Sequence, residues 1–243
     1  MAKDAKTPAP SRGESRQPRP SSAASEIAAF VEKARALGAT AERSGERGRL
    51  IFALDATMSR QPTWDTACML QADMFEEAAR IGGLDVQLIY FRGFRECRAS
   101  RWVSDARALR DLMVRIDCRG GHTQIRKVLA HARKEAGKKP VQALVYVGDC
   151  MEENVDDLCA IAGELGLIRL PVFLFQEGHE PMAANAFREI ARLSGGAYCP
   201  FDPSAAGQLR ELLRAVAAYA AGGRRALEAH GGAGGRRLLE QLK

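Results

Sequence analysis

The chain has 243 residues, of which 46% are hydrophobic, and a formal net charge of +6. This length suits one sizeable α/β domain with tails and is too short for two full domains. The basic excess lies at the ends, because residues 1–20 and 222–243 each carry five basic and two acidic side chains, while residues 21–221 carry 26 of each sign. A middle region without net charge disfavours nucleic acid as the ligand of a folded surface.

Composition divides the chain into four parts. Residues 1–22 combine four prolines with few large apolar side chains, which predicts a disordered basic tail. Residues 23–46 are predicted to form an amphipathic helix over 25–37 and a linker. The folded domain is expected over residues 47–221, and the Gly/Arg-rich segment 222–243 is expected to be a flexible tail.

Neither the apolar stretches nor the cysteines point to a membrane or an exported protein. The longest purely apolar stretches, such as 215–221, are far shorter than the roughly 20 residues that cross a bilayer. The N-terminus has no apolar signal core. The six cysteines include no CxxC pair, which indicates reduced thiols. We therefore expect a soluble, non-exported protein in the cytoplasm, without contact to a membrane.

Strand and helix patterns alternate through the expected domain. Strand patterns cover 50–54, 86–91, 141–147, 172–175 and 197–198, and helix patterns cover 66–80, 105–116, 123–136, 154–165, 183–193 and 205–221. Strands that are apolar throughout and separated by helices indicate a mostly parallel sheet covered on both faces. The predicted fold class is a doubly wound, Rossmann-like α/β layer.

Oxygen-bearing side chains gather where predicted strands end. Asp55, Thr57 and Ser59 directly follow the first strand, Asp149 follows the strand over 141–147, and Thr123 lies on a glycine-rich turn. Function collects at the carboxyl ends of strands in doubly wound sheets. Two carboxylates and three hydroxyls suit a hard divalent cation such as Mg²⁺. Taken singly, these residues also fit structural roles, with Asp55 capping a loop and Thr123 capping a helix.

Together these five residues resemble the metal-ion-dependent adhesion site of the von Willebrand factor type A (VWA) family, of the intracellular bacterial type. The family signature is DxSxS after the first strand, a Thr in a later loop and an Asp after the fourth strand. Here Thr57 stands where Ser is usual. The resemblance implies direct ligation by Thr57 and Ser59. It implies ligation by Thr123 directly or through water, and by Asp55 and Asp149 mostly through water.

A run of arginines allows a second interpretation. Arg92, Arg95, Arg98 and Arg101 recur every three residues among aromatic side chains, a mixture that can bind phosphate or stack on bases. In the family the corresponding region is an edge strand, where basic side chains discourage edge-to-edge pairing.

The sequence contains no P-loop and no GxSxG motif, and no nucleophile and base stand out as a pair. Our hypothesis is a non-catalytic domain that uses Mg²⁺ or Mn²⁺ to bind a protein partner offering an acidic side chain. The expected rim or partner-binding residues are His122, Glu152, Arg95 and Arg98. Two alternatives stay open. One is a metal-assisted phosphohydrolase or nucleotide-binding enzyme using the same cluster, and the other is a nucleic-acid-associated protein using the strand over 92–101. The sequence does not specify an oligomeric state.

Overall fold

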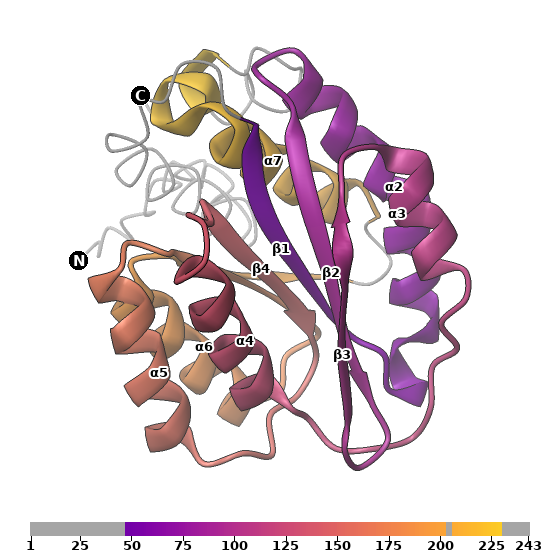
Figure 1. Cartoon of the computed structure of the whole chain (residues 1–243). Coiled ribbons are helices and arrows are strands. Elements are labelled where there is room, and N and C mark those ends of the chain that lie inside the picture. The colour runs from indigo at the N-terminus through magenta and orange to yellow at the C-terminus, as the bar shows by residue number, and fades with distance from the viewer. Residues whose placement is uncertain (1–46, 203–205, 230–243) are drawn as a thin grey trace, which may run out of the picture.

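The computed structural model of the chain describes residues 47–202 and 206–229, in which one sheet lies between two layers of helices (Figure 1). The strands are β1 (Gly48–Asp55), β2 (Leu84–Arg92), β3 (Glu96–Val103), β4 (Ala143–Gly148), β5 (Val172–Glu177) and β6 (Ala197–Phe201). The helices are the short 3₁₀ turn η2 (Met58–Arg60), α2 (Gln61–Ala79), α3 (Ala106–Met113), α4 (Ile125–Ala136), α5 (Val155–Leu167), α6 (Pro181–Ser194) and α7 (Ala206–Ala229). The sequence predictions for residues 1–22 and 23–46 lie outside the described residues.

The sheet has the order β3-β2-β1-β4-β5-β6, with β3 antiparallel to β2 and every other neighbouring pair parallel. This arrangement confirms the predicted doubly wound, mostly parallel fold class. The central strands β1, β4 and β5 are buried at every position, as expected for strands covered on both faces.

Alternate residues of β1 pack on opposite sides of the sheet, as the two-residue period of a strand requires. Leu50, Phe52 and Leu54 join the core beneath α2, α3 and α7. Ile51 and Ala53 join the core beneath α4, α5 and α6. Figure 1 shows the same division, with the two sets of helices on opposite faces.

Several helix boundaries differ from the sequence patterns. Helix α2 begins at Gln61, because Pro62 at its start suits the first turn, where a backbone donor has no partner within the helix. Helix α4 begins at Ile125 rather than at residue 123. The backbone N–H groups of Ile125 and Arg126 donate to the carboxylate of Glu153. The cap of α4 is thus supplied by the loop after β4, and not by Thr123.

Helix α7 extends beyond the predicted end at residue 221. Gly222 and Gly223 interrupt it with non-helical dihedral angles, and the helical assignment then continues to Ala229. Upstream of this break, the backbone of α7 touches β1, since a Cβ at Gly48 would lie 2.1 Å from the carbonyl oxygen of Ala220. The remainder of the predicted C-terminal tail, 230–243, lies outside the described residues. Among the described helices, none is both long and apolar enough to cross a bilayer.

Candidate metal centre

The carboxyl ends of β1 and β4 place two carboxylates side by side. Leu54 pairs with Val147 in the parallel register of these neighbouring strands. Asp55 ends β1, and Asp149 follows the last residue of β4. One carboxylate oxygen of each aspartate and the sulfur of Cys150 lie within 4.8 Å of one another. The sheet topology therefore brings together residues that are separated by more than 90 positions in the chain.

The loop after β1 continues this cluster through hydrogen bonds. The backbone N–H of Thr57 donates to Asp55 Oδ1 at 2.7 Å, so Asp55 also has the loop-capping contact that its residue type suggests. Thr57 Oγ1 lies 3.4 Å from Ser59 Oγ, which in turn donates to Asp149 Oδ2 at 3.3 Å. Asp55 and Thr57 are buried, whereas Ser59 is exposed. A continuous series of polar contacts thus connects four of the five predicted residues.

Two carboxylate oxygens in this cluster lack a hydrogen-bond donor. Asp55 Oδ2 and Asp149 Oδ1 are both buried without a partner. Burial raises the pKa of Asp55 to about 6, and the charge of Asp149 adds to this rise, while the hydrogen bonds from Thr57 oppose it. Buried oxygens of this kind are costly unless a donor or a cation satisfies them. Two carboxylates beside two hydroxyls fit a hard divalent cation.

Thr123 contacts the segment that follows Asp149. Its backbone N–H donates to Glu152 Oε2, and its hydroxyl accepts from the Glu152 N–H, each at 3.1 Å. Its loop is also tied to the first loop, because the Arg119 N–H donates to the carbonyl of Ala56 at 3.0 Å. Thr123 is 5% exposed. Its own hydrogen bonds go to Glu152, so this fifth predicted residue is tied to the loop after β4 and not directly to the other four.

The predicted rim residues lie in the loops before α4 and after β4 and on the β2–β3 hairpin. His122 Nδ1 is 3.0 Å from Glu152 Oε2, and both side chains are about half exposed, at 60% and 48%. The His122 ring also meets Phe94 edge to face, with ring centroids 5.2 Å apart. Arg95 is exposed beside Phe94, and Arg98 lies on β3 with its Nε 3.1 Å from Glu96 Oε1. The rim thus combines aromatic and charged groups.

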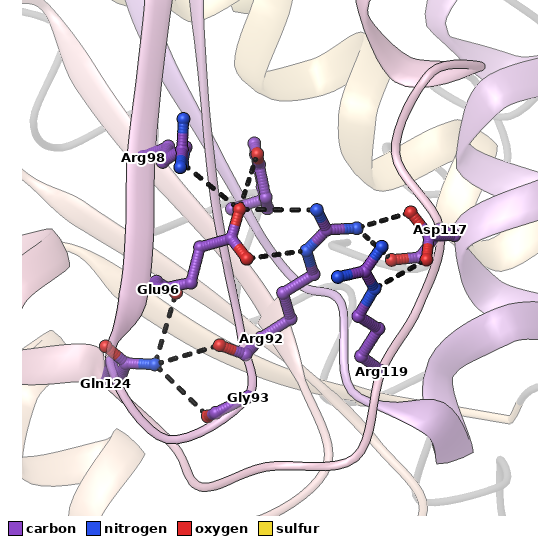
Figure 2. Close-up of polar contacts among 8 residues, drawn as sticks. Arg92, Gly93, Glu96, Arg98, Asp117, Arg119 and Gln124 are labelled. Atoms are coloured by element: carbon purple, nitrogen blue, oxygen red, sulfur yellow. Dashed lines mark hydrogen bonds and ion pairs between the residues drawn. The ribbon is translucent and has the colours of Figure 1, made fainter.

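A second polar cluster, which we call the hairpin network, fixes this rim (Figure 2). Its residues are Arg92, Glu96, Arg98, Asp117, Arg119 and Gln124. Arg92 Nε donates to Glu96 at 3.0 Å, and Arg92 Nη1 donates to Asp117 Oδ1 at 2.6 Å. Gln124 Nε2 donates to the carbonyls of Arg92, Gly93 and Glu96. The network holds the tip of the β2–β3 hairpin against the loop that carries Thr123.

Sequence reasoning missed three members of the centre. Arg60 is 8% exposed, and its Nη2 lies 3.3 Å from Asp149 Oδ2. Arg60 also pairs with Glu177, whose carboxylate accepts from the Thr63 hydroxyl. The only signal for Arg60 was its position directly after Ser59. Cys150, directly after Asp149, was not among the predicted ligands, and burial together with the charge of Asp149 raises the pKa of its thiol to about 12.

Comparisons with known proteins support the fold. A scan against protein-family models and a search of curated proteins found no match. Among solved structures, a von Willebrand factor type A protein from Catenulispora acidiphila is similar with a TM-score of 0.58 and 17% identity, covering 73% of this chain and 43% of that chain. An aerotolerance-related membrane protein from Bacteroides fragilis has a TM-score of 0.54 and 16% identity, covering 68% of this chain and 96% of that one.

A third similar structure contains a metal of its own. Proximal thread matrix protein 1 from the mussel byssus, described with a zinc-occupied MIDAS motif, has a TM-score of 0.55 and 12% identity. The match covers 71% of this chain and 46% of that chain, so the described chain spans less than half of this neighbour. At these identities the likeness concerns the arrangement of the sheet and helices. The fold of this chain is that of the von Willebrand factor type A domain.

Proposed function

We propose that this chain binds a protein partner through a divalent cation, Mg²⁺ or Mn²⁺, held by Asp55, Thr57, Ser59, Thr123 and Asp149, and that it has no catalytic activity of its own. The observation that carries the proposal is the pair of buried, unpartnered carboxylate oxygens of Asp55 and Asp149. A cation held there would offer an open coordination position to a carboxylate of the partner. The zinc-occupied motif of the mussel byssus neighbour supports a divalent cation in this fold.

The chain's own residues would hold and shape this centre. Asp55 is kept in place by the Thr57 N–H, which leaves its second oxygen free to face a cation. Ser59 is exposed and marks the side from which a partner carboxylate can approach. His122, Glu152, Arg95 and Arg98 would contact the partner around this opening. Because hydroxyl ligands carry no charge, we expect weak binding of the cation alone.

The pairing of Arg92 and Arg60 argues against the two alternative functions. A phosphate-binding role for Arg92 would require its side chain to be available, but it is 11% exposed and pairs with Glu96 and Asp117. Arg60, next to the carboxylates, pairs with Asp149 and Glu177. Both guanidinium groups are thus paired with carboxylates of the protein itself. The hairpin therefore favours a structural role for Arg92 over recognition of phosphate or nucleic acid.

A capture experiment tests the proposal. The purified full chain is immobilised and exposed to a cell lysate. The proteins retained in a buffer with Mg²⁺ are then compared, by quantitative mass spectrometry, with those retained in a buffer with chelator. We expect one or a few proteins to require the cation and to be lost in Ser59→Ala, Thr123→Ala and Asp149→Ala. Ser104→Ala is the matched control, because Ser104 bonds to Asp85 at the opposite end of the strands.

The double variant Arg95→Ala/Arg98→Ala should reduce capture less and in a salt-dependent way, since rim charges mainly affect association. Capture that survives chelation and all three site variants but is lost in this double variant would contradict the proposal. Turnover of a phosphate ester by the wild type, abolished in Asp149→Ala, would favour the hydrolase alternative.

A further inference from the structure

Arg60 lies between two carboxylates at the edge of the metal centre. Its side chain is only 10% exposed, and its Nη2 lies 3.3 Å from Asp149 Oδ2. Its Nη1 forms an ion pair with Glu177, at the end of β5. Glu177 is 7% exposed and also accepts from the Thr63 hydroxyl. One buried guanidinium therefore connects the ends of β4 and β5.

The same oxygen of Asp149 receives both Arg60 and the Ser59 hydroxyl, each at 3.3 Å. The oxygen of Asp149 that has no donor, and that is proposed to face the cation, is Oδ1, so Arg60 on Oδ2 and the cation on Oδ1 would share one carboxylate. A guanidinium and a divalent cation on the same carboxylate repel each other strongly. Binding of the cation therefore favours movement of Arg60 away from Asp149.

The local charges fit this exchange. When ionised, the three carboxylates of Asp55, Asp149 and Glu177 exceed the single guanidinium of Arg60 by two negative charges, which one divalent cation neutralises. A cavity of about 360 Å³ lies next to Arg60 and is also lined by Asp149, Glu177 and His179. The side chain has room to turn toward it while it keeps its contact with Glu177.

We propose that Arg60 is the resident counter-cation of the metal centre, which neutralises Asp149 until a divalent cation displaces it, and that Glu177 retains the displaced guanidinium. This inference rests on the metal site of the proposed function and concerns its regulation. Arg60 then sets how tightly the cation binds, and it holds the empty centre in shape. Glu177 has the opposite effect, because it competes with Asp149 for the same guanidinium.

The prediction is a pair of opposite changes in the affinity for Mn²⁺. Arg60→Gln should bind Mn²⁺ about tenfold more tightly, because the repulsion at Asp149 is gone. Glu177→Gln should bind it more weakly, by about three- to tenfold, because Arg60 then pairs with Asp149 alone. Arg192→Gln is the matched control. It removes the same charge from an exposed residue that pairs with Glu189 within α6, and we expect less than about a twofold change.

The double variant Arg60→Gln/Glu177→Gln separates displacement from simple charge. It leaves the net charge unchanged, so an effect of charge alone predicts wild-type affinity. Displacement predicts an affinity several-fold above the wild type, since Asp149 no longer has a competing cation. The double variant also avoids leaving Glu177 buried without a partner, which protects against misfolding of the single variant.

The experiment is isothermal titration of the full chain with MnCl₂, with thermal unfolding of each variant in chelator to check the fold. Unchanged affinity in Arg60→Gln and in the double variant, beside Mn²⁺ binding that Asp55→Ala abolishes, would overturn this inference and leave the proposed function standing. Binding of Mn²⁺ by Arg60→Gln but not by the wild type would support the inference and overturn the metal-dependent function. Absence of binding in all variants would overturn both.

Discussion

The hairpin network and the candidate metal centre contain the same kinds of side chain, but their carboxylates differ in how they are paired. In the hairpin network, each carboxylate faces guanidinium groups, with Glu96 contacting Arg92 and Arg98, and Asp117 contacting Arg92 and Arg119. Hydrogen bonds from Arg119 and Arg92 lower the pKa of Asp117 to about 2. In the metal centre, by contrast, burial raises the pKa of Asp55 to about 6.

The difference lies in whether each carboxylate oxygen has a donor. Asp55 Oδ2 and Asp149 Oδ1 are buried with no hydrogen-bond donor, whereas the network carboxylates have several. A satisfied ionic cluster holds a structure in place, while an unsatisfied one stores unfavourable free energy that a ligand can release. Perturbed groups of the second kind mark binding sites more often than structural ones. The comparison can be tested by removing charges from both clusters.

The largest expected effect on stability comes from Arg92→Met. This change removes the guanidinium that joins Glu96 to Asp117 and keeps much of the apolar stem. We expect the free energy of unfolding to fall by about 2 kcal/mol, because hydrogen bonds between charged groups are lost and the partly buried carboxylate of Glu96 loses its main partner. Urea denaturation at neutral pH measures the change. Stability equal to that of the wild type would show that the network does not hold the hairpin.

Asp55→Asn, unlike Arg92→Met, should increase the free energy of unfolding of the metal-free protein. Since the folded-state pKa of Asp55 is raised, this group favours folding at low pH and loses that contribution as the pH rises through about 6. At about pH 7.5 the asparagine variant should therefore be more stable than the wild type in chelator, by about 1 to 2 kcal/mol. Denaturation curves near pH 5 are the control, where the two proteins should approach each other. A destabilised variant at the higher pH would contradict this interpretation of the centre.

The affinity for Mn²⁺ should follow the same titration. A cation binds the ionised carboxylate of Asp55, so acid competes with it below the folded-state pKa of about 6. We expect an affinity about tenfold weaker at about pH 5 than at about pH 7.5, measured by titration calorimetry. A constant affinity across this range would show that Asp55 does not face the cation.

Arg98→Ala should change stability least. Arg98 contacts the same carboxylate as Arg92, but its side chain is 71% exposed. We expect a change below about 0.5 kcal/mol, because solvent and salt screen such pairs. A loss of stability comparable to that of Arg92→Met in the same urea assay would contradict this expectation. It would mean that pairing with Glu96 stabilises the hairpin even when the arginine is exposed.

Much of this protein could be predicted from the sequence. Continuous apolar strands such as β1, β4 and β5 need helices on both faces, which determines the fold class without further information. The placement of Asp55 and Asp149 at the ends of strands also follows from the sequence, because parallel strands end at one edge of the sheet. Local hydrogen bonds such as that between Thr57 and Asp55 depend on residues two positions apart, and their residue types suggest them.

Contacts between distant segments were decided only by the tertiary structure. Arg60 and Glu177 meet because β4 lies between β1 and β5, so that the ends of three strands converge on Asp149. Arg92 becomes a structural residue because it pairs with both Glu96 and Asp117. Residue types and local periodicity fix which side chains can pair. The order of strands in the sheet selects which of those pairs form, since it determines which carboxylate each arginine can reach.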